Sequence, residues 1–79
     1  LWSDTIEVAG LNLINGVIPK SDYLYVKIRY STVSERVAGI RETDEGLVIK
    51  TLKPLRAVTP GQSAVIYNDR IVVGGGIII

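Results

Sequence analysis

The sequence predicts an all-β fold, a small six- to seven-stranded antiparallel barrel in one domain that spans residues 1–79. Apolar and polar residues alternate with a period of two along most of the chain, as they do in half-buried strands. Residues that favour turns separate these stretches. Strands this short leave unpaired edges, and closure into a barrel is the common way of removing them.

The first expected strand contains a break at Gly10. Its apolar positions lie in two pairs on either side of this glycine, and they are Ile6, Val8, Leu11 and Leu13. Asn15-Gly16 then predicts a turn, and residues 19–22 predict a loop that leads into the second strand.

The clearest alternation covers residues 23–30. In an extended strand the core-facing side chains are Leu24, Val26, Ile28 and Tyr30, and the opposite face consists of Tyr23, Tyr25, Lys27 and Arg29. Alternating aromatic and basic groups are typical of nucleic-acid surfaces. Tyrosines also stabilise exposed sheet faces without any ligand, and in an excised domain the same stripe can face a lost neighbouring domain. These interpretations stay open.

A third strand is predicted over residues 35–41, with Ala38 and Ile40 facing inward. Residues 43–46 predict a hairpin loop in which Gly46 is free to take a positive φ.

The fourth expected strand, residues 47–52, has apolar side chains in both registers. We assign Leu47, Ile49 and Thr51 to the core. Burial of Lys50 would cost more free energy than exposure of Val48, which excludes the other register. Pro54 is expected to end the strand because it lacks a backbone donor. Residues 55–58 fit either a short bridge strand or a loop.

The last third of the chain predicts a turn and a hairpin. Thr59-Pro60-Gly61-Gln62 has Pro and Gly at the positions that a type II turn prefers. Residues 63–67 and 70–73 predict two strands around Asn68-Asp69. The glycines at 74–76 are expected to bend or bulge the chain into a terminal strand, residues 77–79.

The composition excludes several kinds of chemistry. The chain has no Cys and no His, so it lacks the thiolate nucleophile and the usual general base. The acids of the loop at 42–45 are expected to be solvated, so we predict no metal site. The net charge of +1 is too small to indicate a nucleic-acid partner by itself. No apolar run is long enough for a membrane span, so no membrane partner is expected. The absence of Met at the start indicates a domain excised from a larger protein.

Residues 56–79 carry a specific resemblance. They read Arg-Ala-Val-Thr-Pro-Gly-Gln-Ser-Ala-Val-Ile-Tyr, followed after a short hairpin by Gly-Gly-Gly-Ile-Ile-Ile. This stretch resembles the C-terminal end of the tRNA-specific 2-thiouridylases, the enzymes that place sulfur on the wobble uridine of certain tRNAs. Val26-Lys27-Ile28-Arg29-Tyr30 is similar to the V-K-x-R-Y element of that family, and Asn12-Leu13-Ile14 to its N-W-I segment. Leu13 and Thr51 replace aromatic residues of the family pattern, which affects packing.

The resemblance implies a C-terminal tRNA-binding barrel, similar to the second-domain barrels of translation factors. It implies that Arg29, Tyr30 and Gln62 contact tRNA in the anticodon stem region, with Lys27 and Arg56 as electrostatic support. An Arg fork can hold a phosphate, a Tyr can stack on a base, and a Gln can bond a base edge. From the residues alone, Arg29 is more simply a solvated strand residue and Tyr30 a core residue.

The family's S-G-G-x-D-S motif and its two catalytic cysteines are absent here. We therefore expect no catalytic residue and no cofactor in this chain. The resemblance implies that the parent enzyme is cytoplasmic, uses ATP and a persulfide sulfur donor, and works with a sulfur-relay protein. Its catalytic and central domains are expected to contact this barrel. The alternatives are a barrel that packs only on its parent enzyme without touching RNA, and an independent small-molecule-binding barrel.

Overall fold

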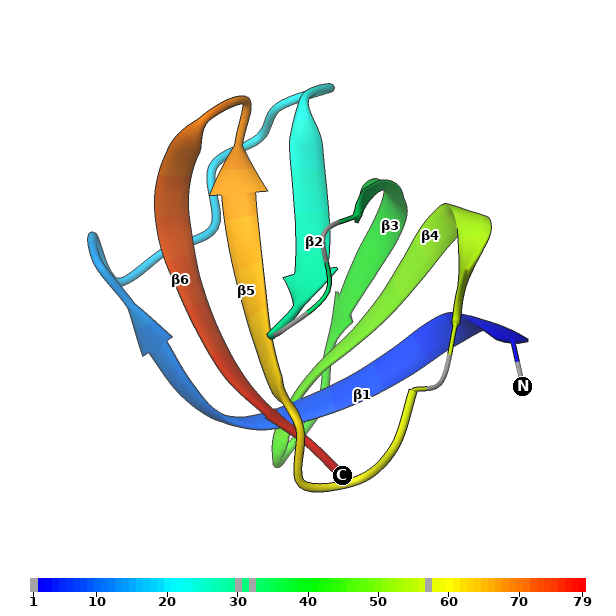
Figure 1. Cartoon of the computed structure of the whole chain (residues 1–79). Helices are drawn as coiled ribbons and strands as arrows, with labels where there is room; N and C mark the ends of the chain where they lie inside the picture. Colours follow the sequence, from blue (N-terminus) through cyan, green and yellow to red (C-terminus); the bar gives the residue numbers. More distant parts are fainter. Residues whose placement is uncertain (1, 30, 32, 57) are drawn as a thin grey trace.

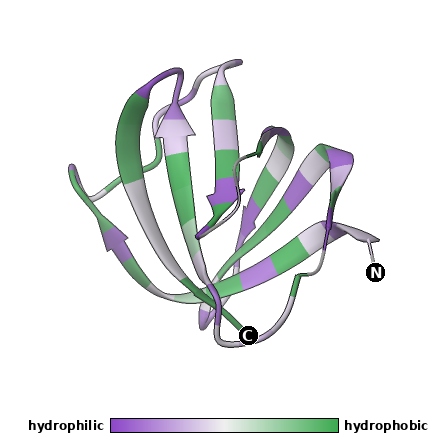
Figure 2. Cartoon of the chain, viewed as in Figure 1, coloured by the Kyte–Doolittle hydropathy of each residue, from purple (hydrophilic) through white to green (hydrophobic). Residues whose placement is uncertain are grey.

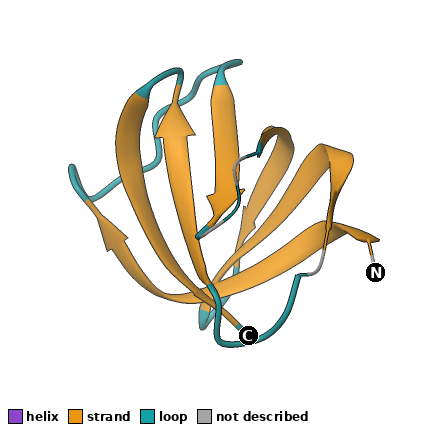
Figure 3. Cartoon of the chain, viewed as in Figure 1, coloured by secondary structure: helices purple, strands orange, loops and turns teal. Residues whose placement is uncertain are grey.

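The computed structural model describes residues 2–29, 31, 33–56 and 58–79, and six antiparallel strands close into a barrel (Figure 1). Around the barrel the strand order is β1-β4-β3-β2-β5-β6. The described residues form strands and loops without a helix (Figure 3), so no membrane-spanning helix occurs among them. The predicted all-β barrel is confirmed with six strands. Their bounds are β1 Trp2–Leu13, β2 Leu24–Ile28, β3 Ser34–Glu42, β4 Gly46–Arg56, β5 Ser63–Asn68 and β6 Ile71–Ile78.

The interior of the barrel is filled by alternate side chains of the strands. Apolar and polar bands succeed one another along the ribbons in Figure 2, as the pleat of a strand requires. The predicted inward faces of β2 and β4 are confirmed for the described residues, and Tyr30, also predicted to face inward, lies outside them. The buried core consists of Ile6, Val8, Leu24, Val26, Ile28, Leu47, Ile49, Leu55, Ala64, Ile66, Val73 and Ile78, together with the polar Thr51.

The break predicted at Gly10 is a bulge inside one long strand. Gly10 has a φ of +62°, which a glycine adopts without strain. The register of β1 against β6 shifts between Ala9 and Asn12. Because of this bend, the first part of β1 pairs with β4 and its last part with β6, which closes the barrel.

The prediction that Ala38 faces inward is wrong. Ala38 is exposed, whereas Val37 and Ile40 pack against the core. The register of β3 against β4 shifts between Val37 and Gly39, so one extra residue is accommodated there. A bulge of this kind shifts which residues face inward and which face outward along the rest of the strand.

The prediction that Pro54 ends the fourth strand is also wrong. β4 continues to Arg56 and turns sharply at its middle (Figure 1), where its register against β1 shifts between Thr5 and Ser3. Pro54 lies in this irregular segment, so its missing N–H removes no ladder bond. The buried hydroxyl of Thr51 donates to the carbonyl oxygen of Lys53 at 2.6 Å, which holds the irregular segment together.

Two glycines, Gly46 and Gly75, allow neighbouring strands to approach closely. The predicted hairpin loop is confirmed by Thr43 N–H, which donates to the Gly46 carbonyl oxygen at 2.8 Å. Gly46 does not have a positive φ, and a Cβ there would collide with the carbonyl oxygen of Val8. Gly75 likewise lies within β6, and its absent Cβ leaves room for the carbonyl oxygen of Ala64. The bulge predicted for the glycine run is present at its start, where the register of β6 against β5 shifts between Gly74 and Val72.

The hairpin between β5 and β6 forms one residue later than predicted. Asn68 pairs with Ile71, so Asp69 and Arg70 make the two-residue turn. Asp69 has a φ of +56°, a conformation that Asp tolerates better than most residues. The turn points the Arg70 side chain back toward β2, which matters for the outer surface described below.

Candidate nucleic-acid interface

Arg29 lies directly beyond the end of β2, where its backbone is still held by the sheet. Its N–H donates to the carbonyl oxygen of Ser63 at 2.8 Å, which extends the β2–β5 ladder by one step. The Arg29 side chain is exposed. An exposed, charged side chain on a fixed backbone is suited to hold an anionic group at a defined place.

The turn at Thr59-Pro60-Gly61-Gln62 has the predicted geometry. Gly61 has a φ of +94°, and Gln62 N–H donates to the Thr59 carbonyl oxygen at 3.4 Å. The side chain of Gln62 adds a second bond, because Thr59 N–H donates to Gln62 Oε1 at 3.0 Å. The positions of Pro and Gly agree with a type II turn, which requires a positive φ at its third residue.

The same turn is tied to the end of β6. Gly61 N–H donates to the Ile78 carbonyl oxygen at 2.7 Å, and Ile78 N–H donates to the Gln62 carbonyl oxygen at 2.8 Å. Ile78 itself is a core residue. The turn is therefore supported by the barrel and has a fixed position.

Arg29 and the turn line a common hollow of about 400 Å³, although they are more than thirty residues apart in sequence. The lining residues are Arg29, Pro60, Gly61, Gln62 and Ser63. Of these only Arg29 carries a charge, so the hollow suits an anionic or polar ligand. Two of the three predicted contact residues therefore lie together. The third, Tyr30, lies outside the described residues.

The two predicted supporting cations lie in different places. Lys27 is half-buried on the outer face of β2, two residues before Arg29. Arg56 is exposed at the end of β4, opposite Trp2 of β1, and is not among the residues that line the Arg29 hollow. Of the two cations, Lys27 is therefore the one that lies on the same strand as the approach to Arg29.

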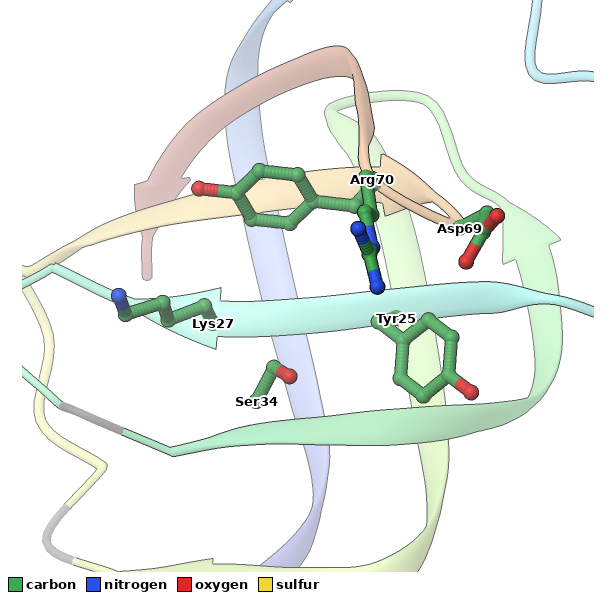
Figure 4. A pocket seen from close by; sticks show the side chains of 6 residues that line it. Tyr25, Lys27, Ser34, Asp69 and Arg70 are labelled. Atoms are coloured by element: carbon green, nitrogen blue, oxygen red, sulfur yellow. The ribbon is translucent and has the colours of Figure 1, made fainter.

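Beside the Arg29 hollow, the outer face of the sheet holds a second one of about 390 Å³ (Figure 4). The β2 stripe predicted from the sequence contains two of its lining residues, Tyr25 and Lys27, and the other four come from neighbouring elements. The outward register of β5 could have identified Tyr67, because Ala64 and Ile66 occupy its inward positions. The residues that line this second hollow are Tyr25, Lys27, Ser34, Tyr67, Asp69 and Arg70.

Among the described residues no group of three or more acidic side chains is placed to hold a metal ion. The side chains gathered at the two hollows are cations, tyrosines, hydroxyls, an amide and one acid. These groups can bind and orient an anionic, aromatic ligand. They form no pair of nucleophile and base.

Comparisons with known proteins agree with the resemblance seen in the sequence. A family model described as the aminomethyltransferase beta-barrel domain matches residues 3–78. The tRNA-specific 2-thiouridylase MnmA 2 of Thermoanaerobacter sp. (strain X514) is 42% identical over 99% of this chain and 22% of its own length. MnmA 1 of Caldanaerobacter subterraneus subsp. tengcongensis is 44% identical over 99% of the chain and 22% of its own length. MnmA of Nitrosomonas eutropha is 38% identical with the same coverage, 99% and 22%.

The chain thus spans about 22% of the length of these relatives. No solved structure matches it significantly.

Proposed function

The chain belongs to the aminomethyltransferase β-barrel domain family, and we propose that it is the C-terminal tRNA-recognition domain of a tRNA-specific 2-thiouridylase. Similarity to these enzymes over 99% of the chain supports the assignment. The domain holds tRNA near the anticodon stem, so that the wobble uridine reaches a catalytic domain elsewhere in the longer protein. Orientation is its contribution, because a misplaced reacting atom lowers the rate steeply.

The parent enzyme then performs the chemistry for which this chain has no groups. In this proposal it is a cytoplasmic tRNA-uridine 2-sulfurtransferase that uses ATP and receives persulfide sulfur from a sulfur-relay protein. Its catalytic and central domains contact the barrel. The lack of Cys and His in this chain agrees with a binding role.

The shared hollow of Arg29 and Gln62 is the observation that supports RNA contact most directly. The Arg29 guanidinium can hold a phosphate with two parallel N–H bonds. Gln62 Oε1 already accepts a bond within the turn, so we expect its Nε2 group to donate to the ligand. Lys27 and Arg56 add positive potential. The proposed contact of Tyr30 is carried over from the family motif.

A second candidate function is packing against another domain of the longer protein, without RNA contact. A groove of about 400 Å³ on the outside of β1, β5 and β6 favours it, because its floor is formed by the glycines at 74–76. Exposed apolar side chains rim this groove, among them Ile14, which is 66% exposed, and Ile77, which is 43% exposed. Such a surface is suited to another apolar face.

Binding of a tRNA transcript by the longer protein separates the two functions. We expect Arg29→Gln to weaken binding about tenfold or more, the effect of losing a charge-assisted contact. It should also lower the slope of log affinity against log salt by about 1. The matched control is Arg41→Gln, which removes an exposed arginine from the far end of β3. Equal affinities of the two variants would favour the packing function.

A further inference from the structure

The outer face of β2 and β5 carries two tyrosines on adjacent strands. Tyr25 of β2 pairs directly with Tyr67 of β5, and both side chains are half-buried. Side chains that stand opposite each other on adjacent strands are about 5 Å apart at their Cβ atoms. Both rings line the hollow of about 390 Å³ shown in Figure 4. The face therefore offers two aromatic rings beside a hollow that is open to solvent.

Basic side chains lie on several sides of Tyr25 and Tyr67. Lys27 lies one step along β2 from Tyr25, and Arg70 extends from the β5–β6 turn toward β2 (Figure 4). Arg36 pairs with Tyr25 from the other side. The lining contains a single acid, Asp69. The local charge is thus positive, although the whole chain has a net charge of only +1.

Arg36 is held in place by its neighbours. Its Nε and Nη2 donate to the carbonyl oxygen of Asp22 at 3.0 and 2.7 Å, and its guanidinium carbon lies 5.9 Å from the centre of the Tyr23 ring. Two bonds and a cation–π contact hold the guanidinium beside Tyr23, outside the hollow. Arg36 therefore adds positive potential near the hollow without lining it.

The tyrosine hollow and the Arg29 hollow lie along the same strand. Tyr25, Lys27 and Arg29 follow one another at every second position of the β2 register, so their side chains point to the same side. Each step is about 6.6 Å along a strand. A single RNA strand can therefore pass from one hollow to the other with cations beside its backbone.

We propose that the hollow formed by Tyr25 and Tyr67 holds one unpaired nucleotide of an RNA strand that continues into the Arg29 hollow. The base stacks on the Tyr67 ring, and the adjoining phosphates lie at Lys27 and Arg70. Proteins that bind unpaired RNA combine aromatic platforms with cations in this way. The proposal rests on the proposed RNA-binding function and extends it to a second surface.

The stacking is tested in the longer protein with a fluorescent tRNA transcript. Tyr67→Leu keeps an apolar side chain but removes the ring, and we expect about tenfold weaker binding. Tyr67→Phe keeps the ring and should bind within about twofold of the unmutated protein. The matched control is Tyr23→Leu, because Tyr23 is exposed on the same side but does not line the hollow. It should leave affinity unchanged.

The phosphate contact has a different signature. Lys27→Gln should weaken binding and lower the slope of log affinity against log salt by about 0.7 to 0.9, the value for one phosphate. Tyr67→Leu should leave that slope unchanged. Lys53→Gln, which removes an exposed lysine from β4, is the control for the loss of one charge.

The outcomes separate this proposal from the function on which it rests. If Arg29→Gln weakens binding and Tyr67→Leu does not, RNA recognition stands and the nucleotide site is overturned. If neither variant weakens binding, both are overturned. Equal losses from Tyr67→Leu and Tyr67→Phe would exclude stacking. A lower melting temperature of the longer protein with unchanged affinity for Tyr67→Leu would show a domain contact instead.

Discussion

Gln62 has the two ends of its amide group in different environments. Its Oε1 accepts the N–H of Thr59 at 3.0 Å and so belongs to the turn. A backbone N–H can only donate, so this bond fixes which end of the amide faces the turn. The Nε2 group is left to donate to a ligand in the hollow that Gln62 shares with Arg29. One side chain thus serves both the turn and the proposed contact.

Two substitutions of Gln62 distinguish these roles. Gln62→Glu keeps an acceptor for Thr59 and removes both donors, so we expect at least about tenfold weaker tRNA binding and a stability change within about 0.5 kcal/mol. Gln62→Leu removes the acceptor as well and should destabilise the fold by about 1 kcal/mol. The measurements are binding of a tRNA transcript and urea unfolding followed by circular dichroism. Unchanged binding by Gln62→Glu would exclude Gln62 as a contact.

At the scale of the element, β6 depends on glycines because its neighbours approach it closely. A Cβ at Gly75 would meet the carbonyl oxygen of Ala64, and one at Gly76 would meet that of Ala9. Gly74 in addition has a φ of +156°, at the edge of the range that side chains disfavour. The run of three glycines lets β6 lie tightly against both β5 and β1.

Gly75→Ala tests this close approach. We expect a loss of about 1–3 kcal/mol in the free energy of unfolding, because the added methyl group meets backbone that must shift. The control is Gly39→Ala in β3, where a Cβ would have nothing within 4 Å and φ is not positive. That change should be neutral or slightly stabilising, since it reduces the entropy of the unfolded chain. If Gly75→Ala and Gly39→Ala changed the free energy of urea unfolding equally, close approach of the strands at Gly75 would not explain the loss.

At the scale of the whole molecule, the end of β6 closes the barrel and supports the candidate site. Ile78 is 3% exposed, pairs with Val8 of β1, and exchanges backbone bonds with the turn that contains Gly61 and Gln62. Arg29 reaches the same turn through Ser63 of β5. The barrel core and the Arg29 hollow therefore share their structural support.

Ile78→Ala should accordingly affect the entire chain. We expect a loss of about 2–5 kcal/mol in a single cooperative unfolding transition, because a buried side chain is removed from a closed barrel. Ile71→Ala is the matched control at the other end of β6, where the side chain is 73% exposed, and it should change stability by less than about 0.5 kcal/mol. Thermal or urea unfolding measures both. A local transition confined to β6 would contradict the shared support.

The local pattern of the sequence determined the all-β class, the inward faces of β2 and β4, and the turns at Asn15-Gly16 and Thr59-Pro60-Gly61-Gln62. These features depend on side-chain alternation and on residues that favour one backbone conformation, so a short segment of sequence is enough to predict them. The similarity to 2-thiouridylases likewise follows from the order of residues alone.

The places where this alternation is interrupted, and the side chains that meet, depend on how the strands pair in the barrel. Ala38 faces outward and Pro54 lies within β4 because strands from distant parts of the chain impose bulges there. Gly46 is required by a carbonyl of β1 rather than by its own φ. Tyr67 and Arg70 join Tyr25 and Lys27 only after β5 pairs with β2. Register and close approach are properties of paired strands, so neither partner's sequence contains them alone.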